Sequence, residues 1–182
     1  MLAKDAPDPR PMPKSTKPFT PDPKQLARGI EHICYEYANL MSAAHWDMEG
    51  EPPWRTHADD AFLLGCRKIG DFLLSRHRSK LKDGSELPDI LALDYLKPGF
   101  SPDWSLPTWT KEWRDAMNKQ LAHLSYAREK SWVHYDWVPI LEKEFRQAWR
   151  KFRRAVNPKH KSRFSAEMTS CRRKPGFAPI KL

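Results

Sequence analysis

The sequence predicts an all-α protein: a four-helix up-and-down bundle with an extended N-terminal arm and a basic C-terminal tail. Apolar residues recur at steps of three and four in four long segments, which is the period of an amphipathic helix. No segment alternates apolar and polar residues for long enough to be a strand. A chain of 182 residues, 40% of them hydrophobic, can bury one core without disulfides or metals. We therefore expect one helical domain over residues 24–156, between an arm at 1–23 and a flexible tail at 157–182.

The arm is defined by its prolines. Proline fixes φ and has no backbone N–H, so neither a helix nor a central strand persists where prolines are dense. Residues 1–23 contain seven of them, namely Pro7, Pro9, Pro11, Pro13, Pro18, Pro21 and Pro23. We expect this segment to be extended or disordered.

Two helices are expected in the first half of the domain. The first runs from about Pro23 to His45 and ends before the Gly- and Pro-rich break at 50–53. The second begins near Thr56, because Asp59 three positions later completes an approximate capping box. Basic residues at 76–80 suit the C-terminal end of that helix, where the helix dipole favours positive charge.

Two further helices are expected after a long connection at 81–107, within which residues 89–96 are predicted to form a short helix. The third helix spans about Thr108 to Lys130, and the fourth spans about Asp136 to Val156. The fourth has the clearest apolar stripe, formed by Val138, Leu141, Phe145, Ala148, Trp149, Phe152 and Val156. These four segments are what predicts the bundle.

The charge of the chain is unevenly distributed. Residues 146–182 carry 12 basic residues and one acidic residue, whereas residues 1–145 carry 20 basic and 22 acidic residues. A basic segment of this kind binds phosphates with a strong dependence on salt. The residues expected to contact nucleic acid are Arg146, Arg150, Lys151, Arg153, Arg154, Lys159, Lys161 and Arg163. Trp149, Phe152 and Phe164 lie among these charges, either as stacking platforms for unpaired bases or, as their periodicity favours, as core residues.

Several function classes are not supported by any motif. Three cysteines, far apart in sequence, favour reduced thiols and a cytoplasmic location over a disulfide framework. No Cys or His pairs stand at zinc-ligand spacing, no Gly-rich loop precedes a helix, and no Gly-x-Ser-x-Gly elbow occurs. No apolar run approaches the length of a membrane span. We therefore expect no metal, no cofactor and no membrane contact.

Two helical segments contain residues that are suited to catalysis. In the first, Arg67 and Asp71 are four residues apart and share a helix face. In the second, His123 flanks the apolar stripe, and Arg128 follows in register with that stripe. Histidine is the usual general base near neutral pH, and a nearby Arg stabilises developing charge on phosphate. The structural interpretation, an ion pair and a half-buried histidine that fix helix register, is equally compatible with the pattern.

The segments 63–72, Leu-Leu-Gly-Cys-Arg-Lys-Ile-Gly-Asp-Phe, and 117–124, Met-Asn-Lys-Gln-Leu-Ala-His-Leu, resemble a set of uncharacterised bacterial helical proteins. More distantly, they resemble the HEPN superfamily of helical bundles. The resemblance implies a homodimer and a metal-independent endoribonuclease that uses His123 as its base. The Arg that this family places about five residues before the His is Asn118 here. Arg67 or Arg128 would then supply the positive charge, beside Asp71.

Two functions follow from these patterns. The first is a HEPN-like protein that binds RNA and cleaves it without a metal. The second is a non-enzymatic scaffold or adaptor, in which Arg67, Asp71 and His123 form a buried polar network. The sequence leaves open whether the protein is an enzyme.

Overall fold

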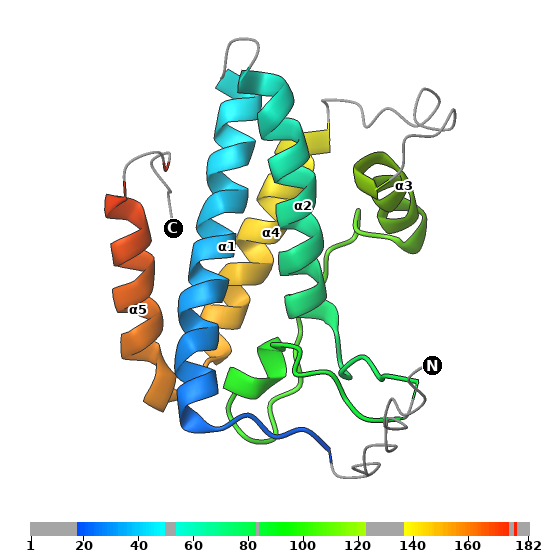
Figure 1. The fold of residues 1–182 in the computed structure, drawn as a ribbon. Helices are drawn as coiled ribbons and strands as arrows, with labels where there is room; N and C mark the ends of the chain where they lie inside the picture. Colours follow the sequence, from blue (N-terminus) through cyan, green and yellow to red (C-terminus); the bar gives the residue numbers. More distant parts are fainter. Residues whose placement is uncertain (1–17, 50–53, 83, 123–136, 175–176, 178–182) are drawn as a thin grey trace, which may run out of the picture.

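The computed structural model describes residues 18–49, 54–82, 84–122, 137–174 and 177, and this part of the chain is all-α (Figure 1). It contains five α-helices, one 3₁₀ helix and no strand, with two isolated β-bridges in the loops. The elements are α1 (Pro23–Glu49), α2 (Trp54–Leu74), η1 (Ala92–Tyr95), α3 (Lys111–Ala122), α4 (Trp137–Ala155) and α5 (Pro158–Arg173). None of these helices combines the length and the apolar character that a membrane crossing requires.

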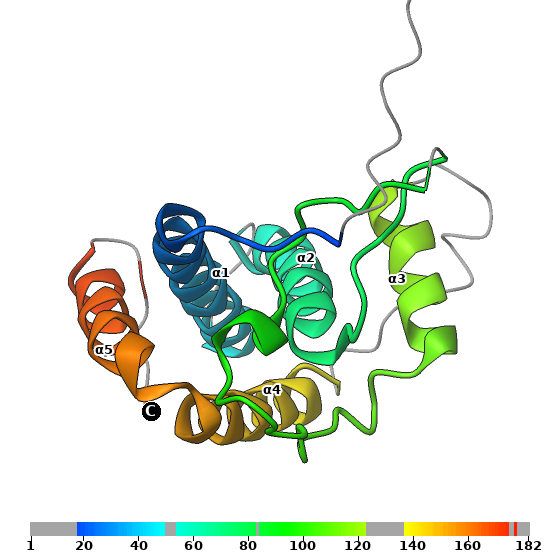
Figure 2. The same ribbon diagram turned by 90° about the horizontal axis from the view of Figure 1, so that it is seen from below.

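The centre of the fold consists of three helices. The long helices α1 and α2 lie antiparallel, side by side, and α4 packs across both on one face (Figures 1 and 2). Helix α5 lies beside α1, and α3 lies on the far side of α2. The antiparallel pair begins at a defined cap, because the Asp22 carboxylate accepts hydrogen bonds from the backbone N–H groups of Lys24 and Gln25 at 2.7 and 2.8 Å.

The prediction of an all-α fold is confirmed, and α1, α2, η1 and α4 stand where the sequence placed helices. The finer prediction, an up-and-down order of four helices, is not confirmed. Helix α3 stands outside the central group, while α5 runs alongside α1. The arm residues 1–17 and the second half of the expected third helix, residues 123–130, lie outside the described part of the chain.

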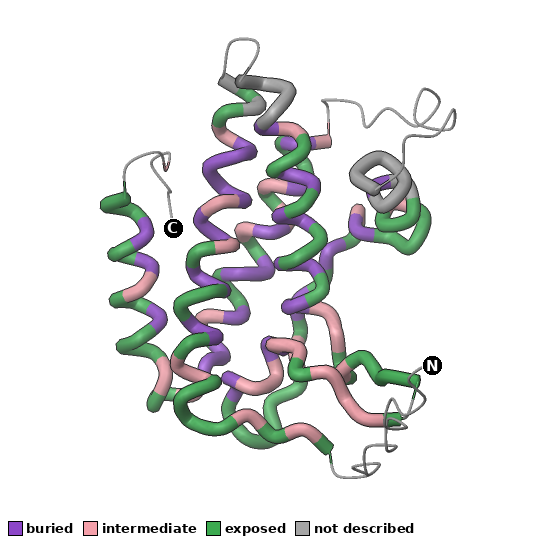
Figure 3. The backbone as a smooth tube through the Cα atoms, in the orientation of Figure 1, coloured by how far each residue is buried: buried purple, intermediate pink, exposed green. Residues whose placement is uncertain are grey.

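The flexible tail expected at 157–182 is wrong over residues 158–173, which form α5. Asn157 caps this helix by accepting a hydrogen bond from the backbone N–H of Lys159, and Pro158 occupies its first turn. Phe164, Met168 and Cys171 recur at steps of four and three and are all buried against the core. The buried positions of α5 lie on its side facing α1 (Figure 3). Only three apolar residues hold α5 in place, so a search for a dense stripe misses it.

The core is built around Trp149 of α4, which is fully buried. Its indole stacks on the Tyr37 ring of α1, with centroids 4.1 Å apart and planes 7° apart. Phe152 and Phe164 pack near it at centroid distances of 5.3 and 6.4 Å. This cluster joins α1, α4 and α5, and burial of rings of this size dominates core energetics.

Candidate functional site

The outer face of α4 is a basic stripe. The buried residues of α4 all face the core, whereas Lys143, Gln147, Arg150, Lys151 and Arg154 are exposed. These five positions follow the helical period, so they lie along one side of the helix. Four of the five are basic, so this face carries positive charge.

Each of the two acidic residues of α4 has a hydrogen-bond partner outside that stripe. Glu142 accepts a 2.7 Å hydrogen bond from Arg146 Nε, and the same pair forms an ion pair through Arg146 Nη2. Glu144 Oε1 accepts a 2.7 Å hydrogen bond from the Thr108 hydroxyl, and the Thr108 backbone N–H donates to the same carboxylate. The charge of Arg146 is thereby largely compensated within α4, which removes Arg146 from the set of free cations.

Lys151 is compensated only weakly. Its Nζ lies 3.6 Å from Asp103 Oδ2 and 3.2 Å from the Asp103 carbonyl oxygen, and both side chains are well exposed. Exposed pairs of this kind contribute about 0–1 kcal/mol and are screened by salt. Lys151 therefore remains able to exchange its partner for a phosphate.

The corner between α4 and α5 is fixed to the rest of the fold. The backbone N–H of Asn157 donates to the Tyr95 carbonyl oxygen at 2.8 Å, and residues 96 and 156 form an isolated β-bridge. The Tyr95 ring meets the rings of His160 and Phe164 edge to face, at centroid distances of 5.6 and 5.4 Å. The side chains on this corner are therefore presented by a rigid support.

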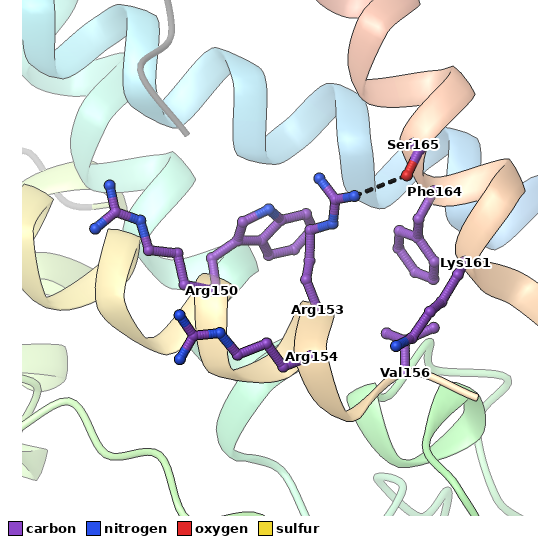
Figure 4. Close-up of a pocket in the computed structure, with 8 residues that line it drawn as sticks. Arg150, Arg153, Arg154, Val156, Lys161, Phe164 and Ser165 are labelled. Atoms are coloured by element: carbon purple, nitrogen blue, oxygen red, sulfur yellow. Dashed lines mark hydrogen bonds between the residues drawn. The ribbon is translucent and has the colours of Figure 1, made fainter. Parts of the chain in front are cut away.

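A hollow of about 460 Å³ lies in this corner (Figure 4). Its lining consists of basic residues, one hydroxyl and buried apolar residues: Trp149, Arg150, Arg153, Arg154, Val156, Lys161, Phe164 and Ser165. The half-buried Arg153 reaches across from α4 to α5, where its Nη2 donates a 2.9 Å hydrogen bond to Ser165 Oγ. The lining contains four basic residues and no acidic one, so the hollow favours anions.

The charged groups beside the hollow are of both signs, because Glu167 of α5 and Arg153 both act on the buried Cys34 thiol. Burial, together with the charge of Lys159, lowers the pKa of His160 below its usual 6.5, so His160 is neutral at pH 7. Lys159 and Arg163 are exposed on α5, outside the lining of the hollow. They extend the positive surface along α5.

Of the eight residues predicted to contact nucleic acid, four line this hollow: Arg150, Arg153, Arg154 and Lys161. The stacking role considered for Trp149, Phe152 and Phe164 is wrong, because these rings are 0%, 0% and 1% exposed. Sequence reasoning missed Ser165, which the period of Phe164, Met168 and Cys171 would have placed on the solvent side of a helix.

The predicted catalytic residues are not assembled within the described part of the chain. Arg67 and Asp71 are exposed on α2. The network expected of them includes His123, so it stays a prediction. Partial desolvation raises the pKa of Asp71, while the charges of Arg67 and of Arg114 on α3 oppose the rise. Asn118 lies within α3. His123 and Arg128 lie outside the described residues.

The remaining ionisable groups of interest are buried thiols. Cys34, Cys66 and Cys171 are free and buried, and burial raises the pKa of each thiol above its usual value. Within the described ranges, no three His, Cys, Asp or Glu side chains form a group that could hold a metal ion.

Comparison with models of known protein families finds no match for the chain, and comparisons with curated proteins and with solved structures find none either. The resemblance to HEPN bundles therefore stays a prediction.

Proposed function

We propose that this protein binds RNA through the α4–α5 corner. The observation that carries the proposal is the one-sign lining of the hollow, in which Arg150, Arg153, Arg154 and Lys161 surround a cavity with no acidic residue. Cations that neutralise phosphates release counterions from the nucleic acid, which drives binding. Guanidinium groups also match phosphate oxygens with two parallel hydrogen bonds.

The hydrogen-bond partners of the acidic residues on α4 also favour phosphate binding at this surface. Glu142 and Glu144 are held by Arg146 and Thr108, so neither has to be displaced before a phosphate approaches the stripe. The charges stand on two helices whose junction is fixed by backbone contacts to η1 and its flank. A surface that needs little reorganisation binds with a smaller entropy loss.

The salt dependence of binding tests this proposal. We expect the full chain to bind a single-stranded RNA, and the slope of log K against log [salt] to fall by about 2 when Arg150, Arg153 and Arg154 are all replaced by Gln. The matched control replaces Arg76, Lys82 and Lys111, all exposed and outside α4, α5 and the lining of the hollow, by Gln. The proposal is wrong if both triple variants lose the same affinity, or if the wild type does not bind.

Cleavage is the second step of the proposed function, and it rests on the resemblance to HEPN bundles. Arg67 and Asp71 are solvent-accessible on α2. His123 would take the proton from a ribose 2′-hydroxyl, whose oxygen attacks the adjacent phosphorus with Arg67 or Arg128 near the phosphate. The bond from phosphorus to the 5′-oxygen of the next nucleotide breaks, and that oxygen takes a proton from water. Purified protein should then cut RNA in EDTA, and His123→Ala should abolish the cut without changing the melting temperature. If the RNA is bound but not cut, the proposed cleavage is wrong and the proposed RNA binding stands.

A scaffold function is favoured by a different surface. A groove of about 650 Å³ runs between α1 and α2, and its lining includes Trp46 and Leu64, which are 47% and 44% exposed. Exposed apolar surface of this kind marks protein contacts. If the chain self-associates here, as the expected homodimer would require, Leu64→Glu should shift its sedimentation to that of a monomer. Unchanged sedimentation would place any self-association on another surface.

A further inference from the structure

We infer that the RNA lies along the exposed face of α4 as a single strand, with one unpaired base seated in a pocket between α4 and residues 104–107. This inference rests on the proposed function, because it names the form of RNA that the same basic surface takes. It is carried by a second cavity, of about 590 Å³, whose lining includes Lys143, Gln147 and Lys151 of the basic stripe.

The charges of the stripe are spaced along the helix. The three stripe residues in the lining are four positions apart, so they stand about 6 Å apart along the axis of α4. Arg150 and Arg154 extend the row toward the end of α4, and their guanidinium groups point away from Lys161 (Figure 4). An extended row of cations fits a row of phosphodiesters, each of which carries one negative charge.

The pocket lies directly beside this row. The chain between η1 and α3 runs beside α4 (Figure 2), and residues 104, 105 and 107 of that chain form one wall of the pocket. Residues of α4 between positions 139 and 151 form the other wall. A base whose phosphate contacts Lys143 or Lys151 can therefore enter the pocket, since both lysines line it.

Two hydrogen bonds hold the wall formed by residues 104–107 in place. The Thr108 hydroxyl donates to Glu144 Oε1 at 2.7 Å, which fastens the end of this segment to α4. The buried Trp104 indole N–H donates to a backbone carbonyl oxygen of α2 at 3.0 Å, which fixes its ring. The pocket is therefore formed before RNA binds, and less entropy is lost on binding.

The lining combines apolar surface with polar groups that suit a base. Pro107, Pro139 and Ile140 are exposed in it, and Ile140 is 48% exposed. A nucleobase has two faces that pack on such side chains and edges that form hydrogen bonds. The Gln147 amide and the Ser105 hydroxyl, in the same lining, each both donate and accept hydrogen bonds.

The charge of the lining favours an unpaired base over a side chain of a protein partner. Lys143 and Lys151 stand against one acid, Glu144, whose carboxylate already accepts hydrogen bonds from Thr108. This excess of positive charge favours an occupant that is attached to negative charge, as every base of a strand is. The bases of a duplex are paired and stacked, so its phosphates can reach the lysines but its bases cannot enter the pocket.

The experiment compares three nucleic acids of one length. They are an RNA strand of about 12 nucleotides, the duplex of the same sequence, and the same strand with abasic sites in place of its bases. Binding to the full chain is followed by fluorescence anisotropy at about 150 mM salt. We expect the single strand to bind at least about fivefold more tightly than either of the others, because it alone offers both phosphates and unpaired bases.

Variants of the pocket separate the base from the phosphates. Ile140→Ala and, independently, Gln147→Ala should remove most of the advantage of the single strand over the abasic strand. Neither residue is charged, so the slope of log K against log [salt] should not change, whereas Lys143→Gln should lower that slope. The matched control is Leu81→Ala, which shortens an aliphatic side chain that is 50% exposed, outside α4 and the lining.

The outcomes distinguish this inference from the proposed function. Equal, salt-dependent binding of all three nucleic acids overturns the base pocket and leaves the proposed function standing. Binding of none of them overturns both. Unchanged binding of the single strand by both Ile140→Ala and Gln147→Ala also overturns the inference, and leaves the pocket to a protein partner. The inference is wrong as well if these variants weaken the abasic strand as much as the complete strand.

Discussion

Two charged regions of this molecule differ in the signs of the side-chain charges that they contain. At the α4–α5 corner, four basic residues line one hollow, and the acids of α4 are held by other partners. At the α2–α3 face, Asp71 lies within electrostatic reach of Arg67 and Arg114, and of Asp89 as well. Charges of mixed sign neutralise one another, whereas charges of one sign produce a field that attracts a counter-charged ligand. The corner is therefore the stronger candidate for recognition of nucleic acid.

The largest expected effect comes from the support beneath the corner. Trp149→Ala removes the ring that joins α1, α4 and α5, and large-to-small changes of this kind cost about 3–5 kcal/mol of the free energy of unfolding. Trp46→Ala is the control, because Trp46 is 47% exposed and surface changes stay within about 0.5 kcal/mol. Denaturant unfolding of both variants measures the difference. Equal losses would contradict the placement of Trp149 at the centre of the core.

A smaller effect is expected from the cap that starts α5. Asn157→Ala removes the acceptor for the Lys159 N–H and should lower the free energy of unfolding by about 1 kcal/mol. Asp22→Ala removes the corresponding cap of α1 and should cost a similar amount. Only Asn157→Ala should also weaken RNA binding, because only that cap lies at the corner. Equal RNA binding by both variants would mean that the orientation of α5 does not matter for recognition.

Removing the acidic partner of a basic residue on α4 should strengthen RNA binding modestly. Glu142→Gln removes one negative charge from α4 and so raises its net positive charge by one, and the salt slope should steepen by up to about 0.7. Asp103→Asn makes the analogous change beside Lys151, where the exposed pair is already weak, and should have less effect. Titrations at several salt concentrations compare the two. A larger change for Asp103→Asn would reverse the ranking of these pairs.

The smallest effect is expected at the α2–α3 face. Arg67→Ala and Asp71→Ala should each change the free energy of unfolding by less than about 0.5 kcal/mol, because both residues are exposed. Desolvation raises the folded-state pKa of Asp71, so its ionised form opposes folding at neutral pH. Asp71→Asn should therefore be at least as stable as wild type at pH 7, and that advantage should vanish as the pH falls below the usual pKa of 3.8. A strong loss of stability in either Ala variant would contradict this expectation and would favour a buried network that contains Arg67 and Asp71.

The fold was more predictable than the site. The periodic stripe of α4 predicted both its limits and its buried face, because every apolar position in that stripe is used by the core. Helix α5 was missed because its buried residues are only Phe164, Met168 and Cys171, and most of its other residues are polar. Its cap, Asn157 before Pro158, was the local signal that could have revealed it.

The candidate site could be predicted only as a list of basic residues. Which of them remain uncompensated depends on contacts between residues far apart in the chain. Thr108 holds Glu144, and Asp103 lies near Lys151, across 36 and 48 positions. No local pattern encodes such pairs. The sequence therefore identified the basic segment but not the hollow within it.

The central claim is that RNA is bound mainly at the α4–α5 corner. Hydrogen–deuterium exchange of the full chain, with and without a single-stranded RNA, tests it directly. We predict slower exchange on RNA binding in residues 146–165, reversed by high salt, with smaller changes in residues 58–74 and 111–122. Protection of α2 and α3 with none in residues 146–165 would contradict the claim.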